Sequence, residues 1–532
     1  MSPQVDVLIV GAGPSGLTLA LQAQAHGAQV RIVDRRPATP RPSRALIMHP
    51  RTLEGLRPLG VTSQLLARAD VAPTADLHVG RRVVRVRLGA LDLPETAFPH
   101  LTLVRQQHVE SVLERVLADR GMEVEHCTEV VSVEDGRDSA RARLHSPSGT
   151  EIVTCSFVAG CDGPVSTVRR AAGIGWYGGP YRQEVVLADV QLRADLARGV
   201  AHVVVGRRGV LLLFALGERA PWRLLVTRPA LHDHPPYGEP GPPVEIADLR
   251  ALLDDAGLGT RIASVVWSAR YPLQHRVAAR FRSGRLFLVG DAAHAFSPAT
   301  GQGMNTGIQD ALNLGWKLAF ATSVSDPTAL LESYELERRP IARRVLALTN
   351  VAFWAEAGTG LLPELLRGVI APLGAPAVPT LVGQRWLVAE AVRCVSQFRA
   401  GYRHSPLSVD EMPRLSPGPR AGQWQSDEPV TAGGEQVRLH ELLACQPGVH
   451  VLVHRDTAPL EQALGAHVVV HRLTSTPGSG VVVVRPDGYV GFRAPAVHQA
   501  RLRQWLARIG VGSRDHQDAR ALPLDRIRPA FP

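Results

Sequence analysis

The chain has 532 residues, of which 45% are hydrophobic and 20% charged, and it carries a formal net charge of +10. This length exceeds what one hydrophobic core fills, and the composition is that of a globular protein, so disordered and fibrous classes are excluded. Apart from Lys317 the basic residues are arginines, scattered rather than gathered in a stripe, which argues against nucleic-acid binding. No apolar run reaches the roughly 18 to 20 residues of a membrane span. We expect a multidomain protein that binds neither nucleic acid nor membrane.

The five cysteines are an odd set without CxxC spacing, which argues against a disulfide framework and a zinc site. Cys155 and Cys161 also lack the CxxxxC spacing of a disulfide reductase. The apolar run from Val5 to Val10 leads directly into glycines and predicts a strand rather than a signal peptide. We therefore expect a cytoplasmic protein without a metal.

The chain begins with a βαβ unit. The apolar strand ends at the loop GAGPSG, a helix follows, and a second strand ends at Asp34. Gly11, Gly13 and Gly16 place backbone N–H groups and the positive end of the helix where they can bind a diphosphate. A carboxylate about twenty residues further on can accept the hydroxyls of an adenosine ribose. This pattern predicts a dinucleotide site, which an NAD-dependent dehydrogenase would share.

The middle of the chain changes character. A helical spacing near residues 108–121 and several strands lead to SFVAGCDG, which ends in Gly-Asp-Gly. From about residue 176 to 271 the sequence consists of short β runs such as EVVLADVQL and VLLLFAL. This spacing predicts a separate, mostly antiparallel sheet.

The stretch LFLVGDAAH returns to the style of the first strand and places Asp291 at a strand end. If the strand joins the same sheet, this acid lies near the first glycine loop and can accept hydrogen bonds from a polyol chain. The following turn, ATGQGMN, presents the N-terminus of a long helix. Such a helix end stabilises a ring that gains negative charge on reduction, as a flavin does, so the pattern favours FAD over NAD.

We therefore predict an α/β protein with four sequence segments. These are the first part of a nucleotide-binding domain (1–175), a β-sheet domain (176–275), the second part of the nucleotide-binding domain with a helical region (276–400), and a smaller C-terminal α/β domain (401–532).

Three segments, GAGPSG, CDGPVSTVRR and LFLVGDAAHAFSPATGQGMNTGIQDALNLGWKLA, resemble in order and spacing the fingerprints of group A flavin-dependent aromatic hydroxylases, the para-hydroxybenzoate hydroxylase-like monooxygenases. The resemblance covers about the first 400 residues of the chain. The remainder is similar to the thioredoxin-like extension of members that modify polyketides and rifamycins. The resemblance implies a GR2-type Rossmann-like FAD domain, an inserted substrate-binding sheet and a thioredoxin-like C-terminal domain.

The resemblance also implies noncovalently bound FAD. The positions that match the family's cofactor residues are Gly11, Gly13, Ser15 and Gly16 for the diphosphate, Asp34 and Arg35 for the adenosine ribose, Arg44 for the phosphates, Gln106 and Asp291 for the ribityl chain, Val131 for the adenine, Asp162, Gly163 and Thr167 for FAD and the nicotinamide nucleotide, and Gly303, Met304 and Asn305 for the isoalloxazine ring.

No residue is assigned firmly to catalysis. The candidates are Arg44, His49 and the backbone of Pro298, and the candidate substrate contacts are His49, Phe214, Trp222 and Pro298. One position departs from the family, because Thr300 stands where the motif PxGGQGMN has a glycine. A β-branched residue resists positive φ, so the local backbone conformation is in question.

The activity implied by the resemblance is that of a monooxygenase. NADPH or NADH reduces FAD, O2 adds to give a flavin C4a-hydroperoxide, and a phenolic or polycyclic aromatic substrate takes one oxygen atom. The C-terminal extension and the arginine-rich composition favour a polyketide substrate from antibiotic biosynthesis. A Baeyer-Villiger insertion on a related polyketide and a non-catalytic flavin- or drug-binding module remain alternatives, although the Asp-Gly pair argues against the second. Both a monomer and a homodimer fit the sequence.

Overall fold

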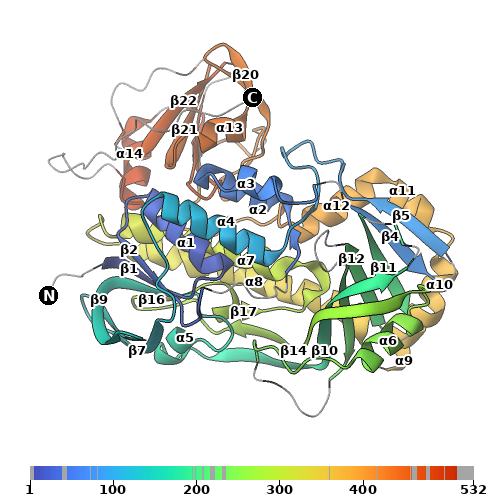
Figure 1. Ribbon diagram of the computed structural model, residues 1–532. Helices are drawn as coiled ribbons and strands as arrows, with labels where there is room; N and C mark the ends of the chain where they lie inside the picture. The colour runs from blue at the N-terminus through green and yellow to red at the C-terminus, as the bar shows by residue number, and fades with distance from the viewer. Residues whose placement is uncertain are drawn as a thin grey trace.

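The computed structural model shows three parts, a parallel-sheet domain, a large-sheet domain beside it and a C-terminal domain (Figure 1). The residues that the structure describes are 5–38, 45–71, 73–80, 82–194, 196–197, 199–206, 209–215, 222–230, 235, 237–358, 360–414, 416–455, 457, 464–465, 467–474, 480–496 and 498–511. This arrangement confirms the predicted α/β fold class.

The parallel-sheet domain is built on a seven-stranded sheet with the order β15-β16-β9-β1-β2, to which β8 and β7 are added beside β9. Its strands are β1 (Val5–Val10), β2 (Val30–Val33), β7 (Glu129–Asp135), β8 (Ala140–Ser146), β9 (Gly149–Gly160), β15 (Arg282–Ser283) and β16 (Leu286–Leu288). Strands β2, β1, β9 and β16 run parallel. Their carboxyl ends therefore lie together at one edge of the sheet.

Helices cover this sheet and bury its apolar strands on both sides, as parallel sheets require. The helices and turns of this domain are α1 (Pro14–Ala25), α2 (Pro50–Leu56), η1 (Arg57–Leu59), α3 (Thr62–Leu66), α4 (Gln106–Asp119), α5 (Thr167–Ala171), η2 (Gly290–Ala292), η3 (Pro298–Thr300), α7 (Gln302–Ala321) and α8 (Thr328–Ala357). A short hairpin pairs β3 (Ile47–Met48) with β6 (Thr102–Leu103).

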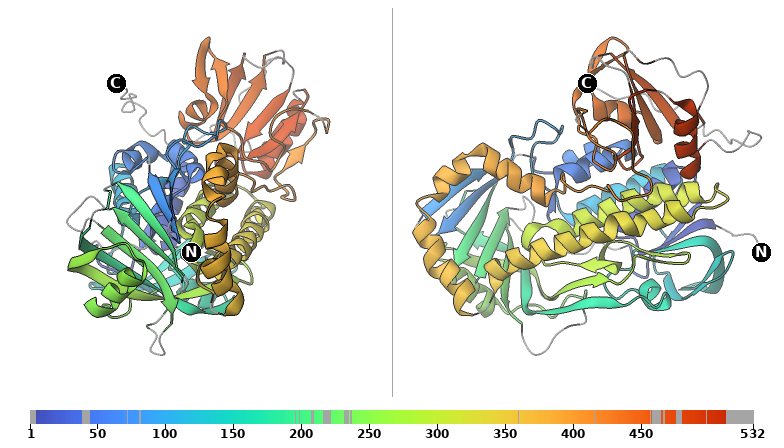
Figure 2. Two further views of the ribbon diagram at one scale, coloured as in Figure 1. Left: turned by 90° about the vertical axis from the view of Figure 1, so that its right-hand side faces the viewer. Right: turned by 180° about the vertical axis from the view of Figure 1, so that it is seen from behind.

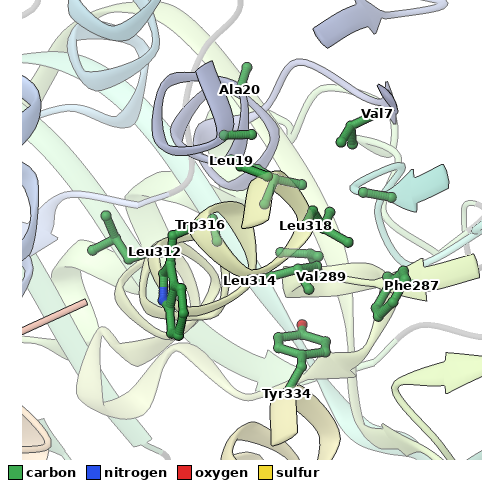
Figure 3. Packing of buried hydrophobic residues seen from close by; sticks show 14 of the residues in the cluster. Val7, Leu19, Ala20, Phe287, Val289, Leu312, Leu314, Trp316, Leu318 and Tyr334 are labelled. Carbon is green, nitrogen blue, oxygen red and sulfur yellow. The ribbon is translucent and has the colours of Figure 1, made fainter. Parts of the chain in front are cut away.

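The core lies where α1, α7 and α8 meet the sheet (Figure 3). Trp316 and Tyr334 are fully buried there, and the Tyr334 hydroxyl donates to the carbonyl of Leu288 at 2.7 Å. Two glycines let α7 approach closely, since a Cβ at Gly315 would lie 2.6 Å from the Cβ of Gln22 and one at Gly307 would collide with Ser15. The glycines of α7 therefore allow its close packing against α1.

The large-sheet domain holds eight strands in the order β17-β14-β10-β13-β12-β11-β4-β5, all antiparallel to their neighbours except β11 and β4. The strands are β4 (Thr74–Val79), β5 (Arg82–Arg87), β10 (Trp176–Arg193), β11 (Val200–Gly206), β12 (Gly209–Ala215), β13 (Trp222–Pro229), β14 (Arg261–Ala278) and β17 (His294–Ala295), with α6 (Ile246–Asp255) on one face.

This sheet is larger than the predicted interval 176–275. It also takes β4 and β5 from the segment 1–175, and β17 from the segment 276–400. The strand pattern of residues 82–87 is visible in the sequence, but the sheet that a strand joins depends on pairing with residues far away in the chain. Here β4 pairs with β11, which lies more than a hundred residues later.

After α8 the chain continues as short helices along the large sheet (Figure 2). They are α9 (Leu361–Leu365), η4 (Leu366–Ile370), α10 (Ala371–Gly374), α11 (Val378–Gly383) and α12 (Arg385–Val395). In the described part of the chain no single helix is long and apolar enough to cross a membrane. The bent pair Thr328–Ala357 and Leu361–Gly374 passes that test only when the two are taken together.

The C-terminal domain has seven strands in the order β18-β24-β23-β21-β22-β19-β20. Its elements are β18 (Val409–Asp410), β19 (Pro429–Ala432), β20 (Glu435–Arg438), α13 (Leu439–Ala444), β21 (Val449–His454), β22 (Val468–Leu473), β23 (Val481–Val484), β24 (Val490–Ala494) and α14 (Gln499–Arg508). At its centre β22 is parallel to β21, whereas β23 is antiparallel to β21 and to β24. This is the arrangement of a thioredoxin-like core, as predicted.

The C-terminal domain packs against α2, where Glu54 is only 3% exposed. Oε1 of Glu54 lies 4.0 Å from Nδ1 of His440 in the C-terminal domain. Burial raises the pKa of the Glu54 carboxyl to about 8. The folded protein therefore keeps a proton on Glu54 at a pH where the unfolded chain releases it.

We expect the free energy of unfolding to fall as the pH rises from about 5 to 8, because the folded-state pKa of Glu54 lies above its unfolded value. Glu54→Gln, which cannot ionise, should remove this contribution. Thermal melts should then show a stabilisation of the variant over wild type that is small at pH 5 and grows toward pH 8. Glu123→Gln, at an exposed position, is the control. A difference that stays constant across this range would contradict the assignment.

Candidate cofactor and active site

The acids predicted to bind the cofactor all follow parallel strands that end side by side. Val10 at the end of β1 is in register with Val33 of β2 and Gly160 of β9, and Gly160 is in register with Leu288 of β16. Gly11 and Asp34 follow these strand ends directly, Asp162 follows one residue later, and Asp291 follows after a short turn. Residues far apart in the sequence thus meet at the edge where open α/β sheets bind ligands.

The glycine loop leaves space where a diphosphate would lie. Gly11 has φ +103°, and a Cβ there would collide with the carbonyl of Cys161. A Cβ at Gly16 would collide with the carbonyl of Gly11, so neither position tolerates a side chain. In the described part of the chain, a Cβ at Gly13 would meet nothing within 4 Å, and no side chain caps the start of α1. This open approach to uncapped N–H groups fits an anion.

Asp34 is 4% exposed and accepts a hydrogen bond from the backbone N–H of Ala12 at 2.7 Å. Its carboxylate also receives the guanidinium of Arg36, whose Nε and Nη2 lie 2.9 and 2.7 Å from the two oxygens. Burial alone would raise the pKa of Asp34, but Arg36 outweighs it and holds the pKa below its usual value. Arg35, which is predicted to lie at the adenosine-ribose end of the cofactor, is exposed, and the neighbouring Arg36 forms the ion pair with Asp34.

Asp162, Gly163 and Thr167 form one turn at the end of β9. The Asp162 Oδ2 accepts hydrogen bonds from the N–H groups of Thr167 and Val168 at 2.7 and 3.2 Å, which places the carboxylate at the N-terminus of α5. Burial raises the pKa of this carboxyl. Gly163 has φ +76°, and a Cβ there would meet nothing within 4 Å, so the turn is open to a ligand.

Asp291 lies in η2, half-buried. Among the residues that the structure describes, none donates a hydrogen bond to its carboxylate. The preceding Gly290 has φ +60°, and its close contact with Ser15 packs this turn against α1. An ionisable acid held in place without an internal donor is suited to accept hydroxyl groups from a ligand such as the ribityl chain.

The N-terminus of α7 has no side-chain cap, which leaves the N–H groups of its first turn, including Gly303 and Met304, available to a ligand. Asn305 fixes this turn, because its Nδ2 donates to the carbonyls of Ile47 and Gly301 at 2.9 and 2.8 Å. A Cβ at Gly303 would meet nothing within 4 Å. The site therefore fits a ring that carries negative charge on one edge.

Thr300 does not disturb this turn. Positive φ falls on Gly301 (φ +63°), while among the described non-glycine residues only Cys127 and Gln397 have positive φ. The β-branched residue thus occupies a position of η3 where its side chain is tolerated. The departure from the family motif leaves the backbone conformation intact.

The two candidates for catalysis near this turn have different surroundings. His49 is 2% exposed, and burial lowers the pKa of its ring to about 4. Its backbone N–H donates to Oδ1 of Asn305 at 2.9 Å. Pro298 is exposed, and its carbonyl accepts the N–H of Gly301 at 2.9 Å. The backbone of His49 thus ties the start of α2 to α7, and its ring is neutral. Pro298 is exposed instead.

The candidate substrate residues on the large sheet lie on opposite faces. Phe214 belongs to an apolar cluster with Leu212, Leu46 and Leu103, on the face that meets β3. Trp222 packs in another cluster beneath α6. Phe214, but not Trp222, therefore lies on the face of the large sheet next to the β3–β6 hairpin.

The remaining predicted residues lie on other elements or outside the described part of the chain. Gln106 begins α4 and donates from Nε2 to Oε1 of Glu110 at 2.8 Å. Val131 is 54% exposed on β7. The Oγ of Ser15 packs between Gly290 and Gly307. Arg44 lies outside the described residues.

Sequence reasoning missed Asp310, a fully buried acid of α7. Its Oδ2 lies 2.6 Å from Nε2 of His294 and 3.3 Å from the N–H of Gly290, beside Asp291. The sequence does place a charged residue among the apolar positions of this predicted helix, which indicates a buried acid. Its partners could not be predicted, because His294 and Arg338 lie on other elements.

The comparisons with known proteins agree with this geometry. Residues 4–349 match the model of the FAD binding domain family, and residues 418–510 match the aromatic-ring hydroxylase C-terminal family. The 6-methylpretetramide 4-monooxygenase of Streptomyces rimosus is 36% identical over 71% of this chain and 66% of its own length. A flavin-dependent monooxygenase of Mycobacteroides abscessus is 32% identical over 95% of this chain and 100% of its own length.

Among solved structures, the anhydrotetracycline hydroxylase OxyS from Streptomyces rimosus superposes with a TM-score of 0.73 at 28% identity, covering 95% of this chain and 99% of that chain. The family match spans more than half of the sequence, and all three fingerprint segments lie within it. The protein belongs to the FAD-dependent aromatic monooxygenases, with FAD as cofactor and a reduced nicotinamide nucleotide and O2 as co-substrates.

Proposed function

We propose that this enzyme hydroxylates a polycyclic aromatic polyketide. The observation that carries the proposal is the apolar cluster around Phe214, which includes Leu46, the residue before β3, and Leu103 of β6. Asn305 ties β3 to the N-terminus of α7 through the carbonyl of Ile47. Buried apolar side chains beside the hairpin that Asn305 holds suit a flat, apolar substrate. The similar proteins named for 6-methylpretetramide and anhydrotetracycline support this substrate class.

FAD, when bound and reduced, supplies the activation of O2. The chain supplies binding and orientation. The first turns of α1 and α7 present N–H groups to the diphosphate and to the ring, and the Asp291 carboxylate accepts hydroxyls of the ribityl chain. Phe214 and its apolar neighbours exclude water and hold the aromatic carbon near the reaction centre.

His49 takes no proton in this proposal. Its ring is buried and neutral, because burial lowers its pKa to about 4, and the backbone carbonyls of Thr300 and Val395 face it. Its contribution is to hold the α7 turn in place. Positioning of cofactor and substrate therefore accounts for the reaction without an acid-base residue at this turn.

The reaction can be tested by incubating the enzyme with FAD, NADPH or NADH and a panel of polycyclic phenols under 18O2. We expect one labelled oxygen in the product, present as a hydroxyl group by NMR. An oxygen inserted into a ring would contradict hydroxylation. Nicotinamide oxidation that yields only hydrogen peroxide with every substrate would contradict the proposed substrate class.

Asp291→Ala should weaken FAD binding by about 10- to 100-fold, because hydrogen bonds to a charged acceptor are worth about 1.5 to 3 kcal/mol. Titration of the apoprotein with FAD, followed by flavin fluorescence, gives the dissociation constant. Asp119→Ala, which removes an exposed acid at the end of α4, should leave it unchanged. Equal affinities of the Asp291→Ala and wild-type proteins would refute the role of this acid.

Phe214→Ala should lower kcat/KM for the aromatic substrate by about 10- to 100-fold, since a buried aromatic side chain contributes about 1.5 to 3 kcal/mol. Its neighbour Leu213 points to the opposite face, beneath α6. Leu213→Ala should therefore lower the melting temperature with little change in kcat/KM. If both variants lose kcat/KM equally, the substrate does not lie on the Phe214 face.

A further inference from the structure

A buried network lies directly behind the turn that carries Asp291. Asp310, on α7, is fully buried and accepts hydrogen bonds from the N–H of Gly290 at 3.3 Å and from Nε2 of His294 at 2.6 Å. Its other oxygen accepts Nε of Arg338, on α8, at 2.6 Å. Burial alone would raise the pKa of Asp310, but Arg338 and His294 outweigh it and keep the pKa below its usual value. Asp310 is therefore a carboxylate.

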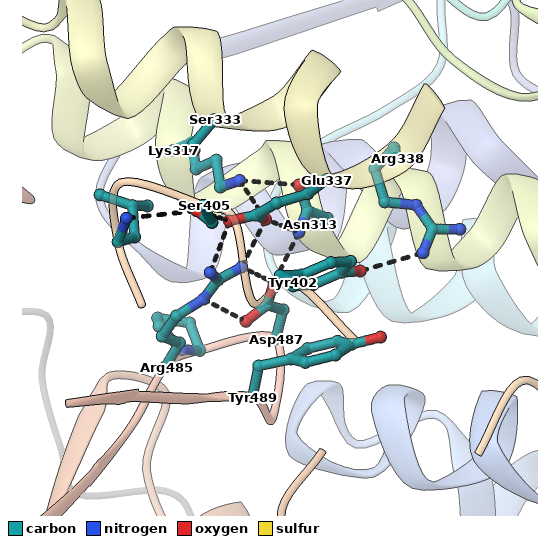
Figure 4. A network of polar contacts seen from close by, with 12 residues as sticks. Asn313, Lys317, Ser333, Glu337, Arg338, Tyr402, Ser405, Arg485, Asp487 and Tyr489 are labelled. Carbon is teal, nitrogen blue, oxygen red and sulfur yellow. Dashed lines mark hydrogen bonds and ion pairs between the residues drawn. The ribbon is translucent and has the colours of Figure 1, made fainter. Parts of the chain in front are cut away.

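Arg338 connects this carboxylate to the C-terminal part of the chain. Its Nη1 donates to the hydroxyl of Tyr402 at 3.0 Å (Figure 4). The Tyr402 ring stacks on Tyr489, which lies between β23 and β24, with 3.9 Å between ring centroids. The Tyr489 hydroxyl in turn accepts a hydrogen bond from Arg51 of α2. A continuous series of contacts thus joins the C-terminal domain to the Gly290 turn.

A second set of buried charges fixes the same domain to α7 and α8 (Figure 4). Arg485 donates to both oxygens of Glu337 at 2.7 and 2.8 Å. Glu337 also receives Lys317 at 2.7 Å, and Asp487 receives Nδ2 of Asn313 at 2.8 Å. Such pairs require strict geometry to offset the cost of burying charge. They leave the C-terminal domain little freedom to rotate on α7 and α8.

We propose that Asp310 is a positioning residue of the flavin site, which the C-terminal domain supports through Tyr402 and Arg338. By holding the N–H of Gly290, Asp310 fixes the turn in which Asp291 faces the ribityl chain. Through Arg338, which also donates to the carbonyl of Thr306 at 3.4 Å, it fixes the first turns of α7. The inference rests on the proposed role of Asp291. It gives the thioredoxin-like domain a part in cofactor binding without any contact with the cofactor.

Asp310→Asn removes the charge and keeps the size of the side chain. We expect FAD affinity to fall by about tenfold, in line with the loss of one charge-assisted hydrogen bond. The midpoint potential of the bound flavin should also shift, because the α7 turn beside the ring moves. Tyr402→Phe removes only the hydroxyl that accepts Nη1 of Arg338. It should also weaken FAD binding, by a smaller factor. Both quantities are measured on the full chain with FAD alone.

A residue that only stabilises the fold would lower the melting temperature without these effects. Glu184→Gln provides the matched control, because Glu184 is a fully buried acid paired with Arg228 at 2.9 Å on the face of the large sheet toward α6. We expect this variant to lose thermal stability while its FAD affinity and flavin potential stay at wild-type values. If Asp310→Asn behaves like Glu184→Gln, the inference is overturned.

A double-mutant cycle separates this inference from the role of Asp291. If Asp310 acts through Asp291, the FAD affinity of the double variant Asp291→Ala, Asp310→Asn should fall by clearly less than the product of the two single losses. Losses that multiply would overturn the inference and leave the role of Asp291 standing. Unchanged affinity in Asp291→Ala alone would instead refute the proposed role of Asp291. Should Asp310→Asn fail to fold, the same cycle with Tyr402→Phe decides.

Discussion

The parallel pairing of β2, β1, β9 and β16 is the constraint on which the rest of the structure depends. Because parallel strands all end at one edge, a glycine loop and three acids from distant segments converge without any one segment encoding the site. Shifting β16 by one residue would turn its side chains to the other face and move Asp291 away from the edge. The apolar pattern of the strands thus fixes the spacing of the acids along this edge of the sheet.

Helix α7 has three structural roles: it presents an uncapped N-terminus, it packs closely on α1, and it carries Asp310. Its uncapped first turn faces the proposed ring site, while Gly307 and Gly315 admit α1 at close range. One turn beyond Gly307, Asp310 holds the Gly290 turn. A helix with larger residues at these positions would stand away from α1 and from the Gly290 turn. The same small residues therefore set how closely α7 packs on α1 and on the turn that carries Asp291.

The local parts of this architecture could be predicted from the sequence. Asp34 and Asp291 each end an apolar strand, so their positions follow from pattern alone, and the thioredoxin-like order follows from resemblance. The ion pair of Asp34 with Arg36 could not be predicted, because it depends on which way each side chain turns from the strand end. Pairing of β4 with β11, and the opposite faces of Phe214 and Trp222, depend on contacts between distant segments.

The buried charges between α7, α8 and the C-terminal domain give that domain one orientation. Apolar residues of similar volume would stabilise the interface as well, but they would tolerate small rotations. In contrast, Glu337 needs donors from α7 and from the C-terminal hairpin together, and a rotation would leave the carboxylate buried with too few of them. In that orientation the Tyr489 ring stacks on Tyr402. With the C-terminal domain held in one orientation, Tyr402 and Arg338 stay in place behind Asp310. Asp310 can then hold the N–H of Gly290 in a fixed position.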